Sequence, residues 1–64
     1  MTTKPVAVVT DGNAFAIIGA ARRAMIKAKY EPEVIKKYIE MATSGDYDHL
    51  LRITMTYVEL EVVA

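Results

Sequence analysis

The chain has 64 residues, eight acidic and eight basic side chains, and no cysteine. The lack of cysteine excludes a disulfide framework, and the zero net charge argues against capture of nucleic acid by a broad basic surface. Hydrophobic residues make up 53% of the chain, which is more than one small core can bury. We therefore expect a single small α+β domain over residues 1–64 that is completed by forming a homo-oligomer.

The first half of the chain predicts a strand followed by a helix. Residues 5–10 are rich in β-branched side chains and indicate a short strand, which ends at the turn Asp11-Gly12-Asn13. From residue 14 to about residue 29, apolar side chains recur at helical spacing. The apolar stripe of this helix consists of Ala14, Ile17, Ile18, Ala21, Met25 and Ala28.

The second half predicts two more helices and a second strand. Pro32 suits the first turn of a helix whose buried stripe is Val34, Ile35, Tyr38, Ile39 and Ala42. We expect Gly45 to stop this helix in a left-handed conformation. Asp46 or Ser44 then caps a third helix that carries Leu50, Leu51, Thr54, Met55 and Val58. Residues 58–63 alternate apolar and acidic, which indicates a strand with one wet face. The predicted order is β-α-α-α-β, with the two strands paired.

Two surfaces of the first predicted helix are candidates for an interface. Small side chains repeat every four residues and form a flat ridge, which packs either against another helix of the same chain or against a second subunit. A further face is apolar and flanked by arginines, as binding surfaces often are. The candidate interface residues are Ala16, Gly19, Ala20, Arg23, Ile26 and Tyr30.

The two predicted helix entries are candidates for a binding pocket. Backbone N–H groups at a helix N-terminus attract anions, and an arginine side chain grips phosphate or carboxylate with two parallel hydrogen bonds. We expect the pocket where the two entry loops meet, with Arg22 as the charged anchor. The candidate ligand-binding residues are Asp11, Gly12, Asn13, Phe15, Arg22, Ser44, Asp46 and Tyr47. The alternative is that Asp11, Asn13 and Asp46 only cap their helices.

Signs of catalysis and of metal binding are weak. The sequence contains none of the nucleotide-loop, nucleophile-elbow or zinc-protease motifs. The single histidine, His49, lies beside Asp48 but lacks a convincing third member of a catalytic group. The segment 46–49 does not have the order of a calcium loop. We expect a protein that is not an enzyme and that carries no cofactor and no metal.

Two segments give the chain a family resemblance. The run from Asp11 to Gly19, together with Arg22 and the run from Thr43 to Leu51, resembles a family of very small proteins encoded by bacteriophages and prophages. The resemblance covers roughly residues 11 to 58. It implies an accessory protein of the host-cell cytoplasm that binds a host protein or captures a small host molecule. No activity is attached to the family.

Three functions follow as expectations. The first is a non-enzymatic oligomer that binds a small anionic or nucleotide-like ligand and so sequesters a host signal molecule. The second is an interaction module that inhibits a host protein through the face formed by Phe15, Ile26 and Tyr30. The third is a helix-turn-helix regulator, for which the third predicted helix offers only Arg52 as a basic residue. Binding of nucleic acid is therefore the least favoured. No apolar run approaches the roughly 18 residues needed to cross a bilayer, and residues 1–4 lead into no secretory signal, so we expect no membrane contact.

Overall fold

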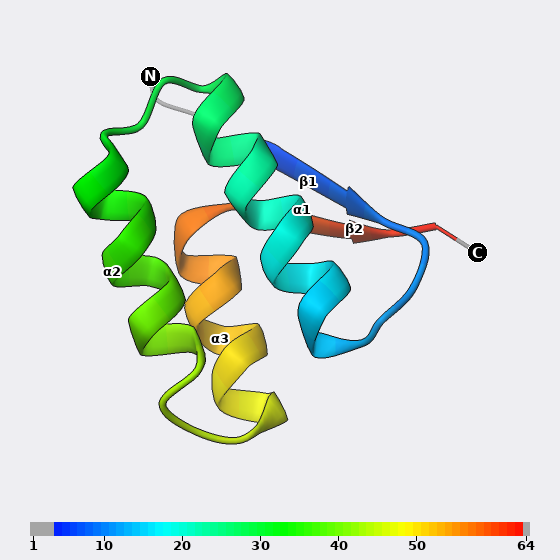
Figure 1. The fold of residues 1–64 in the computed structure, drawn as a ribbon. Coiled ribbons are helices and arrows are strands. Elements are labelled where there is room, and N and C mark those ends of the chain that lie inside the picture. The colour runs from blue at the N-terminus through cyan, green and yellow to red at the C-terminus, as the bar shows by residue number, and fades with distance from the viewer. Residues whose placement is uncertain (1–3, 64) are drawn as a thin grey trace.

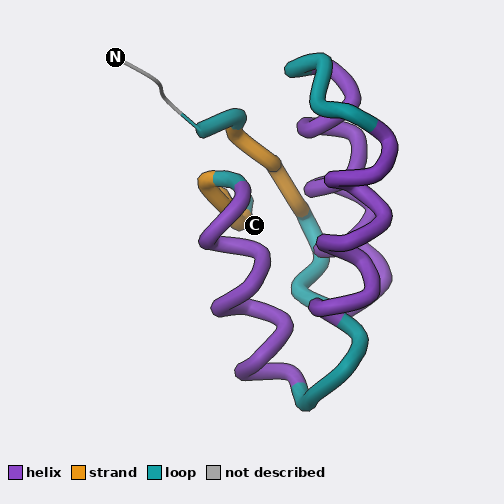
Figure 2. The backbone as a smooth tube through the Cα atoms, turned by 90° about the vertical axis from the view of Figure 1, so that its left-hand side faces the viewer, coloured by secondary structure: helices purple, strands orange, loops and turns teal. Residues whose placement is uncertain are grey.

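The computed structural model describes residues 4–63 and confirms the predicted order of elements. A short strand, β1 (Val6–Val9), precedes three helices, α1 (Ala14–Lys27), α2 (Pro32–Ala42) and α3 (Tyr47–Tyr57), and a second strand, β2 (Glu59–Val62), follows them. Helices α1 and α2 form one layer, and α3 and the sheet form the other (Figures 1 and 2). Among the described residues, no helix is both long enough and apolar enough to cross a membrane.

The two strands pair in parallel. Val6 lies opposite Glu59 and Val8 opposite Glu61. A parallel pair needs a long crossover, and here the crossover consists of all three helices. Ala7 and Val9 of β1 point into the core, whereas Val6 and Val8 are 49% and 53% exposed. The sheet therefore has one covered face and one open face.

The core contains one buried polar pair. Tyr38 of α2 and Thr54 of α3 are fully buried, and the two hydroxyl oxygens lie 2.7 Å apart. The ring of Tyr38 also packs against that of Tyr57, with 5.3 Å between the centroids. Burial raises the pKa of Tyr38, although the hydrogen bond to Thr54 acts in the opposite direction. This pair fixes how α2 sits against α3.

Helix α1 ends at Lys27, two residues earlier than the periodicity predicts. Lys29 takes a left-handed conformation with φ of 66°. Its N–H donates to the carbonyl of Ile26, and the N–H of Tyr30 donates to that of Met25, each over 3.0 Å. This is the hydrogen-bond pattern of a Schellman motif, which reverses the chain without a glycine. It places Tyr30 at the top of the space between α1 and α2.

The prediction that Gly45 ends the second helix in a left-handed conformation is wrong. No described glycine has a positive φ, and α2 already ends at Ala42. The last carbonyls of α2 accept from the next residues through backbone and side chain together: the N–H and the hydroxyl of Thr43 donate to Ile39 over 3.0 and 2.8 Å, and those of Ser44 donate to Met41 over 3.3 and 2.7 Å. Gly45 is needed for space, since a Cβ there would lie 2.8 Å from the ring of His49.

Several residues predicted to be buried are not. Val34, Met55 and Ala28 are exposed, because the apolar stripes of their helices are narrower than the sequence pattern indicates. The small-residue ridge on α1 consists of Ala16, Ala20, Ala24 and Ala28. Ala20 is buried, Ala16 and Ala24 are half-buried beside β1, and Ala28 is exposed, so the chain itself covers only part of the ridge.

Candidate binding site

The first helix entry is built by local hydrogen bonds. The side-chain oxygen of Asn13 accepts from the N–H of Ala16 over 2.8 Å and caps α1. A carboxylate oxygen of Asp11 accepts from the N–H of Asn13 over 3.1 Å. Both side chains predicted to contact a ligand therefore satisfy free backbone N–H groups of their own segment.

The second helix entry joins α2 to α3. Asp46 caps α3 by accepting from the N–H of His49 over 2.9 Å. Nε2 of His49 lies 2.7 Å from the carbonyl of Met41 and 3.3 Å from the hydroxyl of Ser44. Because a carbonyl only accepts, this nitrogen carries the proton. The segment 43–49 thus ends one helix and begins the next.

The two entry loops meet, as the sequence predicts. The hydroxyl of Tyr47 donates to the carbonyl of Gly12. Beside this contact lies a small hollow of about 260 Å³, which we call the loop hollow. Most of its lining is apolar, and its acidic group, Asp46, already caps α3. It is lined by Ala14, Phe15, Ile18, Ala42, Thr43, Gly45, Asp46, Tyr47 and Leu50.

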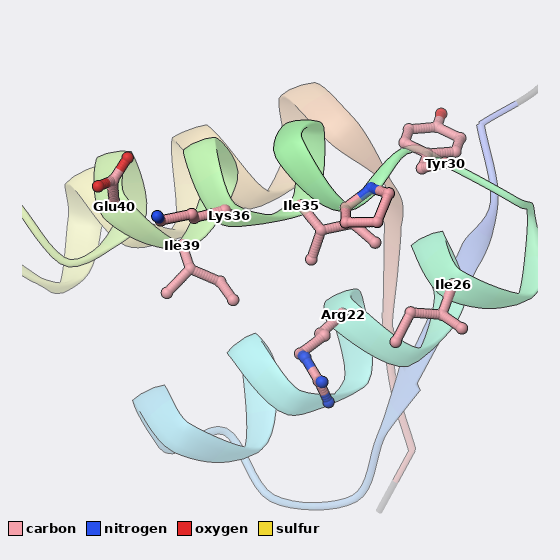
Figure 3. A pocket seen from close by; sticks show the side chains of 8 residues that line it. Arg22, Ile26, Tyr30, Ile35, Lys36, Ile39 and Glu40 are labelled. Carbon is pink, nitrogen blue, oxygen red and sulfur yellow. The ribbon is translucent and has the colours of Figure 1, made fainter.

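A larger hollow of about 460 Å³ lies between α1 and α2, and we call it the α1–α2 groove. In Figure 3, Ile35 and Ile39 point from α2 toward α1, while Arg22 and Ile26 extend from α1. Tyr30 closes one end. The groove is lined by Arg22, Ile26, Tyr30, Pro32, Ile35, Lys36, Ile39 and Glu40.

The structure divides the predicted ligand-binding residues between places. Phe15, Asp46 and Tyr47 line the loop hollow, and Gly12 contacts Tyr47. Arg22 lines the α1–α2 groove instead, and Asp11, Asn13 and Ser44 line neither. A site that combines the entry loops with Arg22 is therefore not formed within one chain.

The predicted interface residues are divided in the same way. Ile26 and Tyr30 line the groove, whereas Ala16, Gly19 and Arg23 line a hollow beside β1 together with Phe15. Phe15 therefore lines a different hollow from Ile26 and Tyr30, so the three residues of the predicted face do not share one. The side chain of Phe15 is almost fully exposed, with 89% of its surface accessible to solvent.

The α2 side of the groove was predicted only as part of a core stripe. Ile35 is buried in the core as predicted, whereas Ile39 is only half-buried and lines the groove. One feature of the sequence indicated the groove. Lys36 and Glu40 directly follow Ile35 and Ile39, which places charged side chains at the border of an apolar face.

No group of three or more histidine, aspartate or glutamate side chains within residues 4–63 is placed to hold a metal ion. The comparisons with protein-family models, with curated proteins and with solved structures gave no match. The resemblance to small phage-encoded proteins stays a prediction.

Proposed function

We propose that this protein binds a small anionic, nucleotide-like molecule in the α1–α2 groove and performs no chemistry on it. The observation that carries the proposal is an apolar hollow of about 460 Å³ with Arg22 on its wall. Small-molecule sites are commonly hollows of about 300–1,000 Å³, lined by apolar side chains with a few polar groups that orient the ligand. The groove has this composition, and the loop hollow is smaller and lacks a cation.

The lining assigns a role to each side of the ligand. Ile39 offers an apolar wall for a ring system, with the buried Ile35 beside it, and Tyr30 offers an aromatic face at one end. The guanidinium of Arg22 binds a phosphate or carboxylate with two hydrogen bonds. Lys36 adds a second positive charge, and Glu40 accepts from a hydroxyl or amine of the ligand.

The same lining favours binding over catalysis. It contains no histidine, serine, threonine or cysteine, so the usual pairs of nucleophile and general base are missing from it. His49, the one histidine of the chain, is engaged at the α2–α3 junction.

Matched ligands test the proposal. We expect adenosine monophosphate to raise the melting temperature and to shift the amide NMR signals of α1 and α2, while adenosine, which lacks the phosphate, does neither. A ligand at 100 times its Kd adds about 2.7 kcal/mol to the free energy of unfolding.

Variants locate the anchor. Arg22→Gln should abolish the shift, and Arg52→Gln should keep it, because Arg52 is an exposed arginine of α3 outside the groove. A response to adenosine and to its phosphate alike, or one that survives in Arg22→Gln, would contradict the role of Arg22. No response to any member of a panel of mono- and dinucleotides would refute the ligand class.

The exposure of Phe15 favours a second candidate, a module that inhibits another protein. A large aromatic side chain with 89% of its surface exposed is a typical anchor of an interface. This candidate predicts that Phe15→Ala abolishes binding of the partner without changing stability, and that nucleotides have no effect. Helices α2 and α3 run side by side in opposite directions (Figure 1), which does not favour a helix-turn-helix, whose helices cross nearly at right angles.

A further inference from the structure

Within residues 4–63 the sheet has two strands and therefore two open edges. The N–H of Glu59 donates to the carbonyl of Pro5 over 2.9 Å, and that of Val63 donates to Val9 over 2.7 Å. In a parallel pair, alternate residues of a strand face the partner strand. The backbone groups of Val6 and Val8 consequently point away from β2, toward the free edge of β1. An edge of this kind is a template for another strand.

The free edge of β1 is bordered by positive charge. A hollow of about 230 Å³ lies between this edge and α1, and its lining includes Arg23 and Lys27 but no acidic residue. Both side chains are exposed. Residues of β1 itself carry no charge, so the edge lacks the charged side chains that commonly protect an edge strand.

The other strand carries the opposite charge. Glu59 and Glu61 lie two residues apart on β2 and are both exposed. Side chains two residues apart on a strand are separated by about 6.6 Å. Arg23 and Lys27 are four residues apart on a helix, which corresponds to a rise of about 6 Å. The spacing of the two acids therefore matches that of the two bases.

We propose that the free edge of β1 binds strand β2 of a second copy of this chain, in a head-to-tail contact. The strand of the second copy continues the sheet, and its Glu59 and Glu61 pair with Arg23 and Lys27 of the first copy. The contact joins two different surfaces, so an open assembly keeps a free β1 edge at one end and a free β2 edge at the other until a ring closes.

The register between β1 and β2 determines the orientation in which the second copy binds. Glu59 and Glu61 lie opposite Val6 and Val8, so they share the open face of their own sheet. Helix α1 of the first copy lies on the covered side. For acids and bases to meet, the second copy docks with its helices on the other side of the extended sheet, which also keeps the two sets of helices apart.

Charge reversal tests this contact in the intact protein by sedimentation velocity over a range of concentrations at low salt. The wild-type chain should associate, and added salt should weaken the association. The double variants Arg23→Glu/Lys27→Glu and Glu59→Lys/Glu61→Lys should each associate at least about tenfold more weakly, because like charges then face one another. An equimolar mixture of the two should associate again, since each supplies the charge that the other lacks.

A matched control separates a local contact from a change in net charge. Lys37→Glu/Arg52→Glu alters the net charge as Arg23→Glu/Lys27→Glu does, but at exposed positions away from the β1 edge, and it should associate like the wild type. Circular dichroism verifies that every variant is folded. A wild-type chain that stays monomeric at all concentrations, an association that neither double variant weakens, or a mixture that fails to associate would each overturn the proposal. Nucleotide binding in the groove is measured separately and does not depend on the outcome.

Discussion

The hydroxyl groups of Tyr38 and Thr54 show how one polar contact is kept in a small core. Neither residue is accessible to water, and each hydroxyl has the other as its partner. A buried hydrogen bond adds about 1 kcal/mol to stability, but leaving one partner alone costs about 1–3 kcal/mol. Removing one hydroxyl of the pair therefore costs more stability than removing both.

Replacing one member of this pair should destabilise more than replacing both. We expect Tyr38→Phe to lower the free energy of unfolding by about 1–3 kcal/mol, because the Thr54 hydroxyl is then buried without a partner. The double variant Tyr38→Phe/Thr54→Val should recover much of this loss. Urea denaturation of Tyr38→Phe, Thr54→Val and the double variant measures the coupling, and equal, additive losses from the two single changes would contradict it.

Burial of Tyr38 also predicts a loss of stability at alkaline pH. The neutral phenol is favoured in the folded chain, so the pKa of Tyr38 is higher there than the ordinary value of 10.0. Burial of the neutral phenol therefore adds to the free energy of unfolding. This contribution is fully present below pH 10 and is lost as the pH rises through the pKa of Tyr38 in the folded chain. We expect the midpoint of urea denaturation to fall more steeply above pH 10 in the wild type than in Tyr38→Phe. Parallel curves would show that Tyr38 does not contribute.

Two glycines should respond to alanine in opposite ways. A Cβ at Gly45 would lie 2.8 Å from the ring of His49, which a hydrogen bond to Met41 holds in place. A Cβ at Gly19, inside α1, would meet only the end of the Arg23 side chain at 3.8 Å. We expect Gly45→Ala to lower the melting temperature, and Gly19→Ala to raise the stability by up to about 1 kcal/mol through helix propensity. Thermal denaturation followed by circular dichroism compares them.

At the scale of the elements, the two segments that carry the predicted family resemblance form helix boundaries. Asp11 and Asn13 build the start of α1, and the segment 43–49 connects α2 to α3. The strands and helices were predictable because caps, proline and apolar periodicity act within a few residues of each other. The end of α2 was not, because the closeness of Gly45 to the His49 ring appears only once α3 has folded back.

The cap of α3 gives a prediction at this scale. Asp46→Ala should reduce the free energy of unfolding by about 1 kcal/mol, because the N–H of His49 loses its acceptor. Asp46→Asn should change it little, since the amide oxygen still accepts. Asp48→Ala, which removes the neighbouring carboxylate but not the cap, is the control. If Asp46→Ala and Asp48→Ala cost the same, the cap is not what Asp46 contributes.

The candidate groove was only half predictable from the sequence. Arg22, Ile26 and Tyr30 stood out because an apolar face bordered by arginine is visible on a single helix. Ile35 and Ile39 were predicted only as members of a buried stripe, which is correct for Ile35. That Ile39 lines a groove was not predictable, because which face of α2 meets α1 depends on the Schellman turn at Lys29. Lysine is an unusual residue at a positive φ, and nothing local in the sequence marked it.

At the scale of the whole molecule, one chain is compact by itself. Its radius of gyration is 10.8 Å, close to the value of about 10.7 Å expected for a folded domain of this length. It nevertheless leaves Phe15, Ile26, Val6, Val8 and Val62 at least half exposed or nearly so. The predicted excess of apolar side chains is visible on the surface, and the homo-oligomer that would cover it stays a prediction.

Removal of β2 should abolish cooperative unfolding. A chain of this length has a total stability of roughly 3–10 kcal/mol, and β2 is the sole partner of β1 among the described residues. A chain ending at Val58 should show a broad thermal transition and exposed apolar surface that binds a hydrophobic dye. A sharp transition near that of the complete chain would mean that the helices are stable without the sheet.

The parallel pairing also has a consequence for biosynthesis. Strand β1 is synthesised before the other described elements, and its only described partner is the last element in the order. Until about fifty further residues have been translated, Val6 to Val9 have no neighbour to bond with, and closure of that loop limits how fast the native contacts form. We therefore expect misassociation through this apolar tetrapeptide chiefly in nascent chains that stall before Glu59.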